Sequence, residues 1–301
     1  MIRYLKHKEI DKSKWDKCIE SSPNGLIYAM SWYLDIVSPM WDAIVEEDYI
    51  TVIPVTKKRK YLIEYLVQPV FAQQLGIFGN NIPNETIKDF YIEVFKRFRF
   101  LRINLNYLNQ GITDFEHVTL KNNYILELNK DYEITKKKYN KSNLNNIIKS
   151  ENNYLVCKKD NEFNNFYEFV CLNYPYKYKS SDYTKLQNLL SEFQKRQIGT
   201  IYSVYDSQNT RLASALFIEY NNRIIYMFSS QTSKGRENKA TFYLIDYYIR
   251  ENSNKQLILD FEGSNIEGIA SFFKGFGAIN QPYYFLNKSN IPSILKKLIK
   301  K

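Results

Sequence analysis

The second half of the chain switches between helical and strand periodicity in a definite order, and this order constrains the fold most. Windows 162–173 and 182–197 repeat apolar residues at helical spacing, with Asp182 placed to cap the second. Window 240–251 is apolar nearly all round, which is typical of a helix buried against a sheet. Strands are expected at 153–157, 200–205, 213–220, 223–228, 256–261 and 283–286, and one more helix at 266–276. The order β-α-α-β-β-β-α-β-α-β predicts an α/β domain with a mixed sheet.

The first half repeats this order more loosely. Strands are expected at 2–5, 41–45, 49–55, 65–71, 102–106 and 123–128, and helices at 14–21, 29–37 and 85–98. No sequence self-similarity at a fixed spacing accompanies the repeat, and 301 residues suit two domains of roughly 150 residues each. We therefore expect an N-terminal domain at 1–130, a basic helical linker at 131–150 and a C-terminal domain at 151–301, with the two domains packed side by side.

Several functional classes are excluded by what the sequence lacks. Three cysteines, Cys18, Cys157 and Cys171, never have CxxC spacing and are expected to be reduced thiols. Two histidines cannot form a histidine-rich metal site, so no metal is expected. Neither GxxxxGK[ST] nor GxGxxG occurs, which argues against phosphate-loop and Rossmann sites. No window approaches 18 apolar residues and no signal peptide is seen, so a cytoplasmic protein without stable membrane insertion is expected.

The composition leaves two questions open. A net charge of +10 suits nucleic acid, phosphorylated ligands or an anionic membrane surface, but also a lysine-rich surface without such a partner. The 26 tyrosines and 19 phenylalanines fit either an AT-rich genome or tyrosine-lined grooves for an amphipathic substrate. The basic segment 291–301 is expected to form a helix that packs on the second domain or touches a membrane surface.

One stretch near the C-terminus combines carboxylates, glycines and aromatic residues. It reads Asp-Phe-Glu-Gly-Ser at 260–264 and Ile-Ala-Ser-Phe-Phe-Lys-Gly-Phe-Gly-Ala at 269–278. Carboxylates and glycines gather at the carboxyl end of a strand when a ligand must approach the backbone there. The stretch resembles the FemAB-like branch of the GNAT (Gcn5-related N-acyltransferase) superfamily, and the element order is that of a GNAT domain. The resemblance implies two tandem GNAT-like domains that catalyse acyl transfer.

Acyl transfer to an amine needs a base, a group that polarises the carbonyl and substrates held in line. Asp260 and Glu262 alternate on the expected strand and would share one sheet face. Glu262 is a candidate base, with capping of the next helix as the alternative, whereas Asp260 is expected to be structural. Lys274, in a motif that borders the cavity in FemAB-like relatives, either steadies the carbonyl oxygen or donor phosphate or is a surface lysine. Tyr226 is a candidate proton donor to the leaving group.

In GNAT domains the donor's pyrophosphate lies on backbone N–H groups before the helix that follows the fourth strand. That loop is 229–240 here, and its donor-binding candidates are Ser230, Lys234, Gly235, Arg236, Asn238 and Ala240. The loop departs from the usual signature because Glu-Asn-Lys-Ala, without a glycine, follows Arg236. An exposed polar loop is the alternative. The matching loop of the first half, 76–85, has no cation, so only the second domain is expected to hold the donor.

The acceptor is expected to face the first domain, where 25–33 and 68–76 resemble the N-terminal domain of the family. Tyr28, Trp32, Phe71, Gln73 and Gln74 are candidates to line a groove for a sugar or peptide. A domain interface is the alternative.

The resemblance favours an N-acyltransferase that moves an acyl group from acyl-CoA, with acetyl-CoA the first candidate, to an amine of a cell-wall or surface-sugar precursor. FemAB-type members that build peptidoglycan bridges use aminoacyl-tRNA, often with a coiled-coil arm. No heptad run of that length occurs here. Aminoacyl-tRNA is the alternative donor, supported by the net charge, and a non-catalytic binding protein is the other alternative. The oligomeric state is left open.

Overall fold

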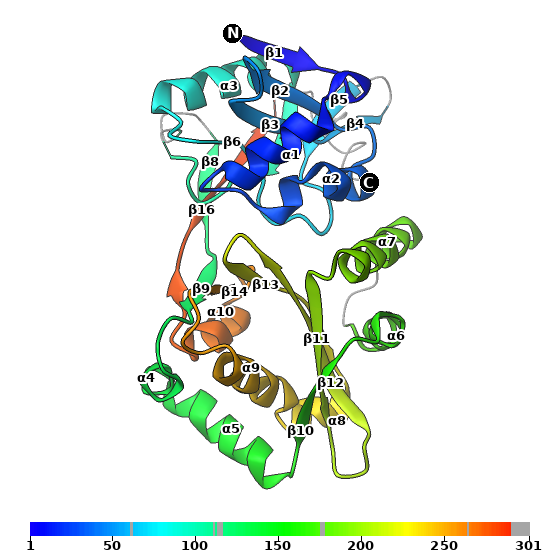
Figure 1. The fold of residues 1–301 in the computed structure, drawn as a ribbon, viewed down its shortest axis with the longest axis vertical. Coiled ribbons are helices and arrows are strands. Elements are labelled where there is room, and N and C mark those ends of the chain that lie inside the picture. The colour runs from blue at the N-terminus through cyan, green and yellow to red at the C-terminus, as the bar shows by residue number, and fades with distance from the viewer. Residues whose placement is uncertain (61–62, 111, 113–116, 175–177, 264, 290–301) are drawn as a thin grey trace. The chain divides into compact units, whose positions relative to one another are not determined.

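The computed structural model describes residues 1–60, 63–110, 112, 117–174, 178–263 and 265–289. The chain divides into two compact units. Unit 1 comprises Met1–Lys121 and the segment that begins at Pro282, and unit 2 is Asn122–Gln281. Both units combine sheets with helices, so the α/β prediction is confirmed (Figure 1).

Unit 1 contains two sheets. The first has the order β1 (Ile2–Leu5), β2 (Asp42–Glu46), β3 (Thr51–Val55) and β6 (Phe78–Gly79). The second has the order β4 (Lys57–Lys60), β5 (Ile63–Val67), β7 (Phe100–Asn104), β16 (Tyr283–Ser289) and β8 (Val118–Lys121). The helical segments are η1 (His7–Glu9), α1 (Lys12–Ser21), η2 (Ile27–Ala29), α2 (Ser31–Val37) and α3 (Asn84–Arg97). Phe90 and Tyr91 of α3 are buried with Leu101 of β7 in one hydrophobic core.

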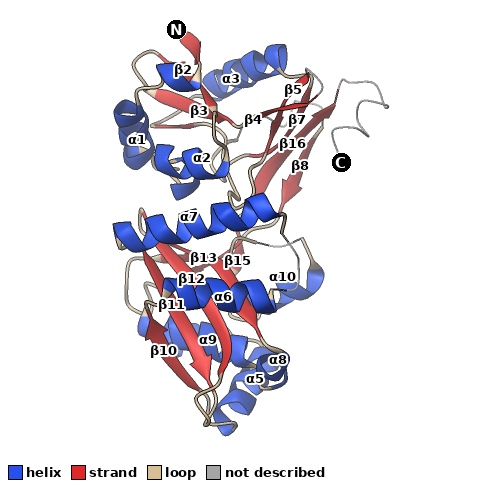
Figure 2. Ribbon diagram, turned by 90° about the vertical axis from the view of Figure 1, so that its right-hand side faces the viewer, coloured by secondary structure: helices blue, strands red, loops and turns tan. Residues whose placement is uncertain are grey.

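Unit 2 is built on one seven-stranded sheet. Its order is β10 (Val156–Asp160), β11 (Gly199–Tyr205), β12 (Arg211–Tyr220), β13 (Arg223–Gln231), β14 (Ile258–Asp260), β9 (Tyr124–Glu127) and β15 (Ile279–Asn280). The helices are α4 (Tyr132–Lys136), α5 (Lys141–Asn152), α6 (Phe163–Asn173), α7 (Ser180–Arg196), α8 (Ser233–Glu237), α9 (Ala240–Glu251) and α10 (Glu267–Lys274). Helices α6 and α7 cover one face of the sheet, and α9 covers the other with α5 packed against it (Figures 1 and 2).

The chain crosses between the units at different points from those expected. Strand β9, expected in the first domain, pairs with β14 and β15 in the sheet of unit 2. Strand β16, expected as the last strand of the second domain, lies between β7 and β8 in unit 1. The expected linker 131–150 instead forms α4 and most of α5, and Ile147 is buried in the core of unit 2. Strand patterns reveal which faces are apolar but not which sheet a strand joins, because pairing is non-local.

Three other expectations concern the C-terminal helix, membrane-spanning helices and metal binding. The expected helix 291–301 lies outside the described residues. Among the helices that the structure describes, none is long and apolar enough to cross a membrane. The described residues also contain no group of three or more His, Cys, Asp or Glu side chains able to hold a metal ion.

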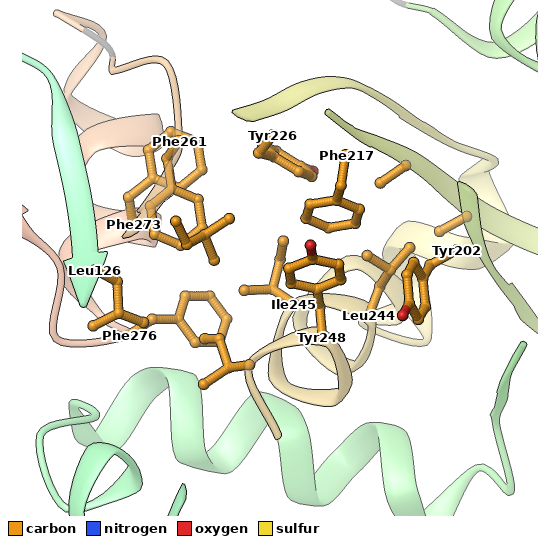
Figure 3. Packing of buried hydrophobic residues seen from close by; sticks show 14 of the residues in the cluster. Leu126, Tyr202, Phe217, Tyr226, Leu244, Ile245, Tyr248, Phe261, Phe273 and Phe276 are labelled. Carbon is orange, nitrogen blue, oxygen red and sulfur yellow. The ribbon is translucent and has the colours of Figure 1, made fainter. Parts of the chain in front are cut away.

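Aromatic rings fill the core of unit 2 (Figure 3). Phe217 of β12 stacks on Tyr248 of α9 with ring centroids 3.5 Å apart, and Phe261 stacks on Phe273 of α10 at 4.6 Å. Tyr226 lies between the two pairs, with its ring centroid 5.4 Å from Phe217 and 6.2 Å from both Phe261 and Phe273. Part of the high aromatic content therefore forms core, and Tyr226 joins the α9 and α10 sides of that core.

Strands β13 and β14 are parallel, and they pair only from Arg223 to Ile225 of β13 and from Ile258 to Asp260 of β14. A buried ion pair fixes this short register, since Arg223 Nη1 lies 2.6 Å from Asp260 Oδ2. A second guanidinium nitrogen donates to Gln281 Oε1 at 2.9 Å. The pair joins one end of the register to the other, and both side chains are buried. It therefore determines where the two strands begin to separate.

The strand predicted at 256–261 is shorter in the structure, where β14 comprises Ile258–Asp260, so the expected alternation of Asp260 and Glu262 on it is wrong. The backbone then turns: Glu262 and Gly263 both have positive φ, and the Glu262 N–H donates to Asp260 Oδ1 at 2.9 Å. A Cβ on Gly263 would lie 2.3 Å from the carbonyl oxygen of Asn122, so only glycine fits there. Asp260 is structural and accepts a backbone N–H, as expected, but it does not share a strand face with Glu262.

Replacing Asp260 with asparagine is expected to lower the free energy of unfolding by about 3–5 kcal/mol, because Arg223 is left buried without its counter-charge. Urea unfolding measures the change. The control is Arg196→Gln, which breaks the exposed pair with Glu192 on α7 and is expected to cost less than about 1 kcal/mol. Equal losses in the two variants would contradict the role given to the buried pair.

Candidate functional site

The candidate site lies where β13 continues beyond the end of β14. After Ile225 the edge of β13 that faced β14 has no strand partner among the described residues, although the strand runs on to Gln231. An irregularity in the pairing with β12 makes Met227 an extra residue, since Tyr226 pairs with Phe217 but Phe228 pairs with Leu216. Because an extra residue changes the alternation, Ser229 and Gln231 lie on the same sheet face as Tyr226.

A pocket of about 390 Å³ occupies this position within unit 2. Strand β13 contributes Tyr226, Ser229, Ser230 and Gln231; the α8–α9 region contributes Arg236, Lys239, Thr241 and Phe242; α10 contributes Ile269, Phe272 and Phe273; the end of α6 contributes Asn173 and Tyr174. The walls are largely aromatic, with polar groups on β13 and two cations at one end. Pockets of this size and composition are typical of sites that bind small organic groups.

The cationic end of the pocket coincides with the start of α9. Lys239 is the residue before this helix, adopts φ +60° and provides no side-chain cap. The first N–H groups of an uncapped helix have no intrahelical partner and carry partial positive charge. Arg236 and Lys239 have no carboxylate partner among the described residues. This end of the pocket is therefore suited to an anionic group.

Two hydroxyls of β13 are available to a bound molecule. Burial raises the pKa of Tyr226 to about 12, so its hydroxyl stays protonated at neutral pH and can donate a hydrogen bond. The hydroxyl oxygen of Ser230 is buried and has no hydrogen-bond partner among the described residues. A buried hydroxyl without a partner is costly, and in a pocket it marks a position where a ligand can bind.

The other two predicted catalytic residues do not line this pocket. Glu262 is half-buried. Burial raises the pKa of Tyr178, and its hydrogen bond to the pocket residue Tyr174 and the charge of Glu262 add to the shift. The charge of Glu262 is therefore felt at a tyrosine next to the pocket. Lys274 is exposed at the end of α10, with its Nζ 5.5 Å from the ring centroid of Tyr124. The structure therefore does not bring Lys274 to Tyr226.

Of the six predicted donor-binding residues, Ser230 and Arg236 line the pocket. Lys234 pairs with Asp206 at 2.6 Å, and the Asn238 amide donates to the carbonyl of Lys234 at 2.7 Å. Ala240 is fully buried in the core. These three residues stabilise the loop and helix α8 rather than facing the pocket.

Gly235 has a packing role. Its N–H donates to Thr232 Oγ1 at 2.9 Å, and a Cβ at this position would lie 2.2 Å from the carbonyl oxygen of Leu212. The glycine therefore lets α8 pack closely on β12. Its N–H is already used, so this loop does not present the open run of backbone donors that a pyrophosphate cradle needs.

Several pocket residues were not predicted from the sequence. Lys239, Thr241 and Phe242 follow the predicted loop directly, and the cation before an expected helix was an available signal for Lys239. Asn173 and Tyr174 come from the end of α6, about fifty residues before β13. Nothing in the local sequence indicates that the packing of α6 on the sheet brings them to the pocket.

The predicted acceptor residues form two groups in unit 1. The first group is Tyr28, Trp32 and Phe71, which all contact Tyr33. The Tyr33 ring centroid lies 5.7 Å from that of Tyr28 and 5.5 Å from that of Trp32, and the Tyr33 hydroxyl donates to the Phe71 carbonyl. In the second, Gln74 Nε2 donates to Gln73 Oε1 at 3.0 Å. Tyr28 and Gln74 are almost fully buried. Both are therefore enclosed in unit 1, and a groove lined by these five residues stays a hypothesis.

Gly235 on α8 and Gly268 on α10 offer a matched test of packing in unit 2. Gly235→Ala is expected to lower the free energy of unfolding by about 1–3 kcal/mol, because the new Cβ meets the Leu212 backbone. Gly268→Ala on α10 meets nothing within 4 Å and is expected to raise it by about 0.4–1 kcal/mol. Urea unfolding measures both. A neutral Gly235→Ala variant would contradict the packing role.

No protein-family model matches the chain, and no curated protein matches it in sequence. Solved structures do match over nearly the whole chain. FemX aligns with a TM-score of 0.67 at 11% identity, covering 99% of this chain and 100% of FemX. A conserved protein of unknown function from Bacteroides thetaiotaomicron aligns with a TM-score of 0.62 at 11% identity, covering 96% and 100%. L-PGS from Bacillus licheniformis aligns with a TM-score of 0.59 at 10% identity, covering 96% of each chain.

These similarities establish the fold. The chain has the fold of FemX and L-PGS over nearly its whole length, in agreement with the fold expected from its sequence. Identities of 10–11% do not transfer an activity. The chemistry must therefore be argued from the pocket of unit 2.

Proposed function

We propose that this chain is a GNAT-fold transferase that moves an acyl or aminoacyl group to an amine, with the reactive end of the donor in the unit 2 pocket. The observation that supports this most is the composition of that pocket. Protonated Tyr226 lines the same pocket as Arg236 and Lys239, beside the uncapped start of α9, and Ser230, whose hydroxyl is unpartnered among the described residues, lines it from the other face of β13. Neutral donors suit a carbonyl, and the cations suit a phosphate.

The reaction follows from these positions. The amine nitrogen attacks the carbonyl carbon, and negative charge develops on the carbonyl oxygen, where the Tyr226 hydroxyl donates a hydrogen bond. The bond from carbon to the leaving oxygen or sulfur then breaks, and the leaving group takes up the second proton that the attacking nitrogen loses as the amide forms. Glu262 is proposed as the base that accepts the ammonium proton, through water or the Tyr178–Tyr174 pair.

The donor that the loop geometry favours is the 3′ end of an aminoacyl-tRNA. Gly235 is packed under a backbone carbonyl and its N–H is already used, so the loop lacks a full pyrophosphate cradle. A terminal ribose ester with one nearby phosphate needs fewer backbone donors. The net charge of +10 also suits a nucleic acid.

Acyl-CoA, with acetyl-CoA as the simplest case, is the second candidate donor. The uncapped start of α9 beside Arg236 and Lys239 favours it, because one phosphate of the donor can still bind there. For either donor we propose an amine of a cell-wall or surface-sugar precursor as acceptor, by analogy with the FemAB-like fold. A GNAT-fold binding protein without catalysis is what remains if neither donor reacts.

Donor binding tests the proposal directly. Aminoacyl-tRNA is expected to bind in a salt-dependent manner and to compete with a short aminoacylated acceptor-stem mimic. Arg236→Gln is expected to lower the affinity for the donor by about tenfold, because a charge-assisted contact to phosphate is lost. The matched control is Arg196→Gln, an exposed arginine of α7 outside the pocket. Calorimetry with acetyl-CoA in parallel decides between the donors. If neither aminoacyl-tRNA nor acetyl-CoA bound, the proposal would be overturned.

Catalysis is tested by removing single groups. Tyr226→Phe is expected to lower kcat by about 10²–10³-fold with little change in donor affinity, because one oxyanion donor is lost. Glu262→Gln is expected to lower kcat by about 10²-fold or more if it acts as the base. Lys274→Ala, on the exposed end of α10, is expected to retain activity. Full activity in Tyr226→Phe would remove Tyr226 from the mechanism.

A further inference from the structure

Unit 1 contains a second pocket, whose lining includes none of the candidate site residues named above. It has a volume of about 260 Å³ and is lined by Val67, Gln68, Arg102, Asn104, Lys121 and Phe285. These residues come from β5 and its end, β7, β8 and β16, which are neighbours in one sheet (Figure 2). The volume is below the roughly 300–1,000 Å³ of pockets that enclose a drug-sized ligand, so it suits a single head group.

The strand registers place the pocket on the sheet face opposite the core. Leu101 and Ile103 of β7 are buried in the core of unit 1, so Arg102 and Asn104 point to the other face. Phe285 of β16 pairs with Asn104 on one side and with Thr119 of β8 on the other. Lys121, two residues after Thr119, lies on the same face. The pocket is therefore formed by regular strands, which hold its side chains more precisely than loops do.

Two cations share the ring of Phe285. Lys121 Nζ lies 3.9 Å from the ring centroid, and Arg102 Cζ lies 5.7 Å from it. Neither cation has a carboxylate partner among the described residues. Burial and the neighbouring charge of Arg102 lower the pKa of Lys121. Two like charges held together without a counter-charge are unfavourable, and a bound anion would relieve the repulsion.

The amide side chains of the pocket are already used within the protein. Gln68 accepts the Asn104 N–H at 3.0 Å and donates to the Ala72 carbonyl at 2.7 Å. Asn104 donates to the Gln73 carbonyl at 2.7 Å and accepts from Lys121 at 3.1 Å. The amides thus fix the wall and orient Lys121. The donors left for a ligand are the guanidinium of Arg102 and the remaining N–H groups of Lys121, which bind only an acceptor-rich, negatively charged group.

We propose that Arg102 and Lys121 form a second binding site, in unit 1, for the terminal phosphate of a small phosphate monoester. A guanidinium fork matches two phosphate oxygens, and the ammonium acts as a point charge on a third. The two positive charges match a phosphate monoester dianion better than a carboxylate or a phosphodiester, each of which has one negative charge. The Phe285 ring provides an apolar floor for the part of the ligand next to the phosphate.

Methyl phosphate is the probe, because its second pKa of about 6 makes it a dianion at pH 8. An NMR titration of the full chain is expected to show saturable shifts in the amides of β7, β8 and β16. Arg102→Gln and Lys121→Met are each expected to weaken binding about tenfold or more, since a charge-assisted hydrogen bond is lost. The matched control Arg59→Gln removes an exposed arginine of β4 outside the pocket and is expected to leave the affinity unchanged.

Repeating the titration in Arg236→Gln distinguishes binding in unit 1 from binding in the unit 2 pocket. This variant is expected to show the same shifts in β7, β8 and β16 as the unchanged chain. Acetate and dimethyl phosphate are compared with methyl phosphate at equal concentration and are expected to bind at least about tenfold more weakly, because each is a monoanion. Equal binding of all three would overturn the assignment to a phosphate monoester. Unchanged affinity in both Arg102→Gln and Lys121→Met would overturn the site itself.

The pH dependence separates a ligand contact from a structural role. The charged groups that line the pocket are Arg102 and Lys121, and the strand registers place Tyr283, Tyr65 and Lys58 on the same sheet face. Since burial and Arg102 lower the pKa of Lys121, affinity for methyl phosphate is expected to fall as pH rises through that pKa, because the ammonium loses its charge. Lys121→Met is expected to lose this dependence and Arg102→Gln to keep it. The same pH dependence in Lys121→Met would exclude Lys121 as a ligand contact.

Discussion

The buried ion pair between Arg223 and Asp260 is the interaction on which the architecture of unit 2 depends. It lies across the only parallel strand pair in the described part of the unit 2 sheet and closes the short register of β13 with β14. Asp260 also accepts the N–H of Glu262, which turns the chain away from the sheet. A buried pair of this kind does little for stability compared with apolar side chains, but it fixes one geometry because either charge alone is very costly.

The pocket follows from that geometry. Because β14 stops at Asp260, the second half of β13 faces α10 and the start of α9 instead of another strand. The extra residue Met227 brings Ser229 to the same face as Tyr226. The stacked rings of Phe261 and Phe273 support Tyr226 from one side and Phe217 from the other, so its hydroxyl is held by packing rather than by a flexible loop. Rigid support is what a group that polarises a carbonyl requires.

Loop 229–240 lacks the open run of backbone donors that a pyrophosphate needs, but it keeps two cations beside the start of α9. Gly235, the residue expected to let a phosphate approach, lets α8 approach β12 instead. The start of α9 nevertheless stays uncapped, and Arg236 and Lys239 remain without carboxylate partners among the described residues. Unit 1 keeps two further unpaired cations, Arg102 and Lys121, on a sheet face that has no counterpart to this loop. Each unit thus has one pocket lined by two cations without a carboxylate partner among the described residues.

The sequence by itself determined most of the longer helices and strands, because periodicity is a local property, but it did not predict the short elements β4, β6, β8, β15 and α8. Residues 2–5 and 240–251 were predicted with the bounds that the structure has. Tyr226, on the expected fourth strand, and Ser230 and Arg236, in the loop expected after it, were named as candidates from the sequence, and all three line the unit 2 pocket. Only the tertiary structure decided which sheet β9 and β16 join, that β14 ends at Asp260 and that Asn173 reaches the pocket. Those outcomes depend on contacts between residues far apart in the chain, and local patterns do not encode such contacts.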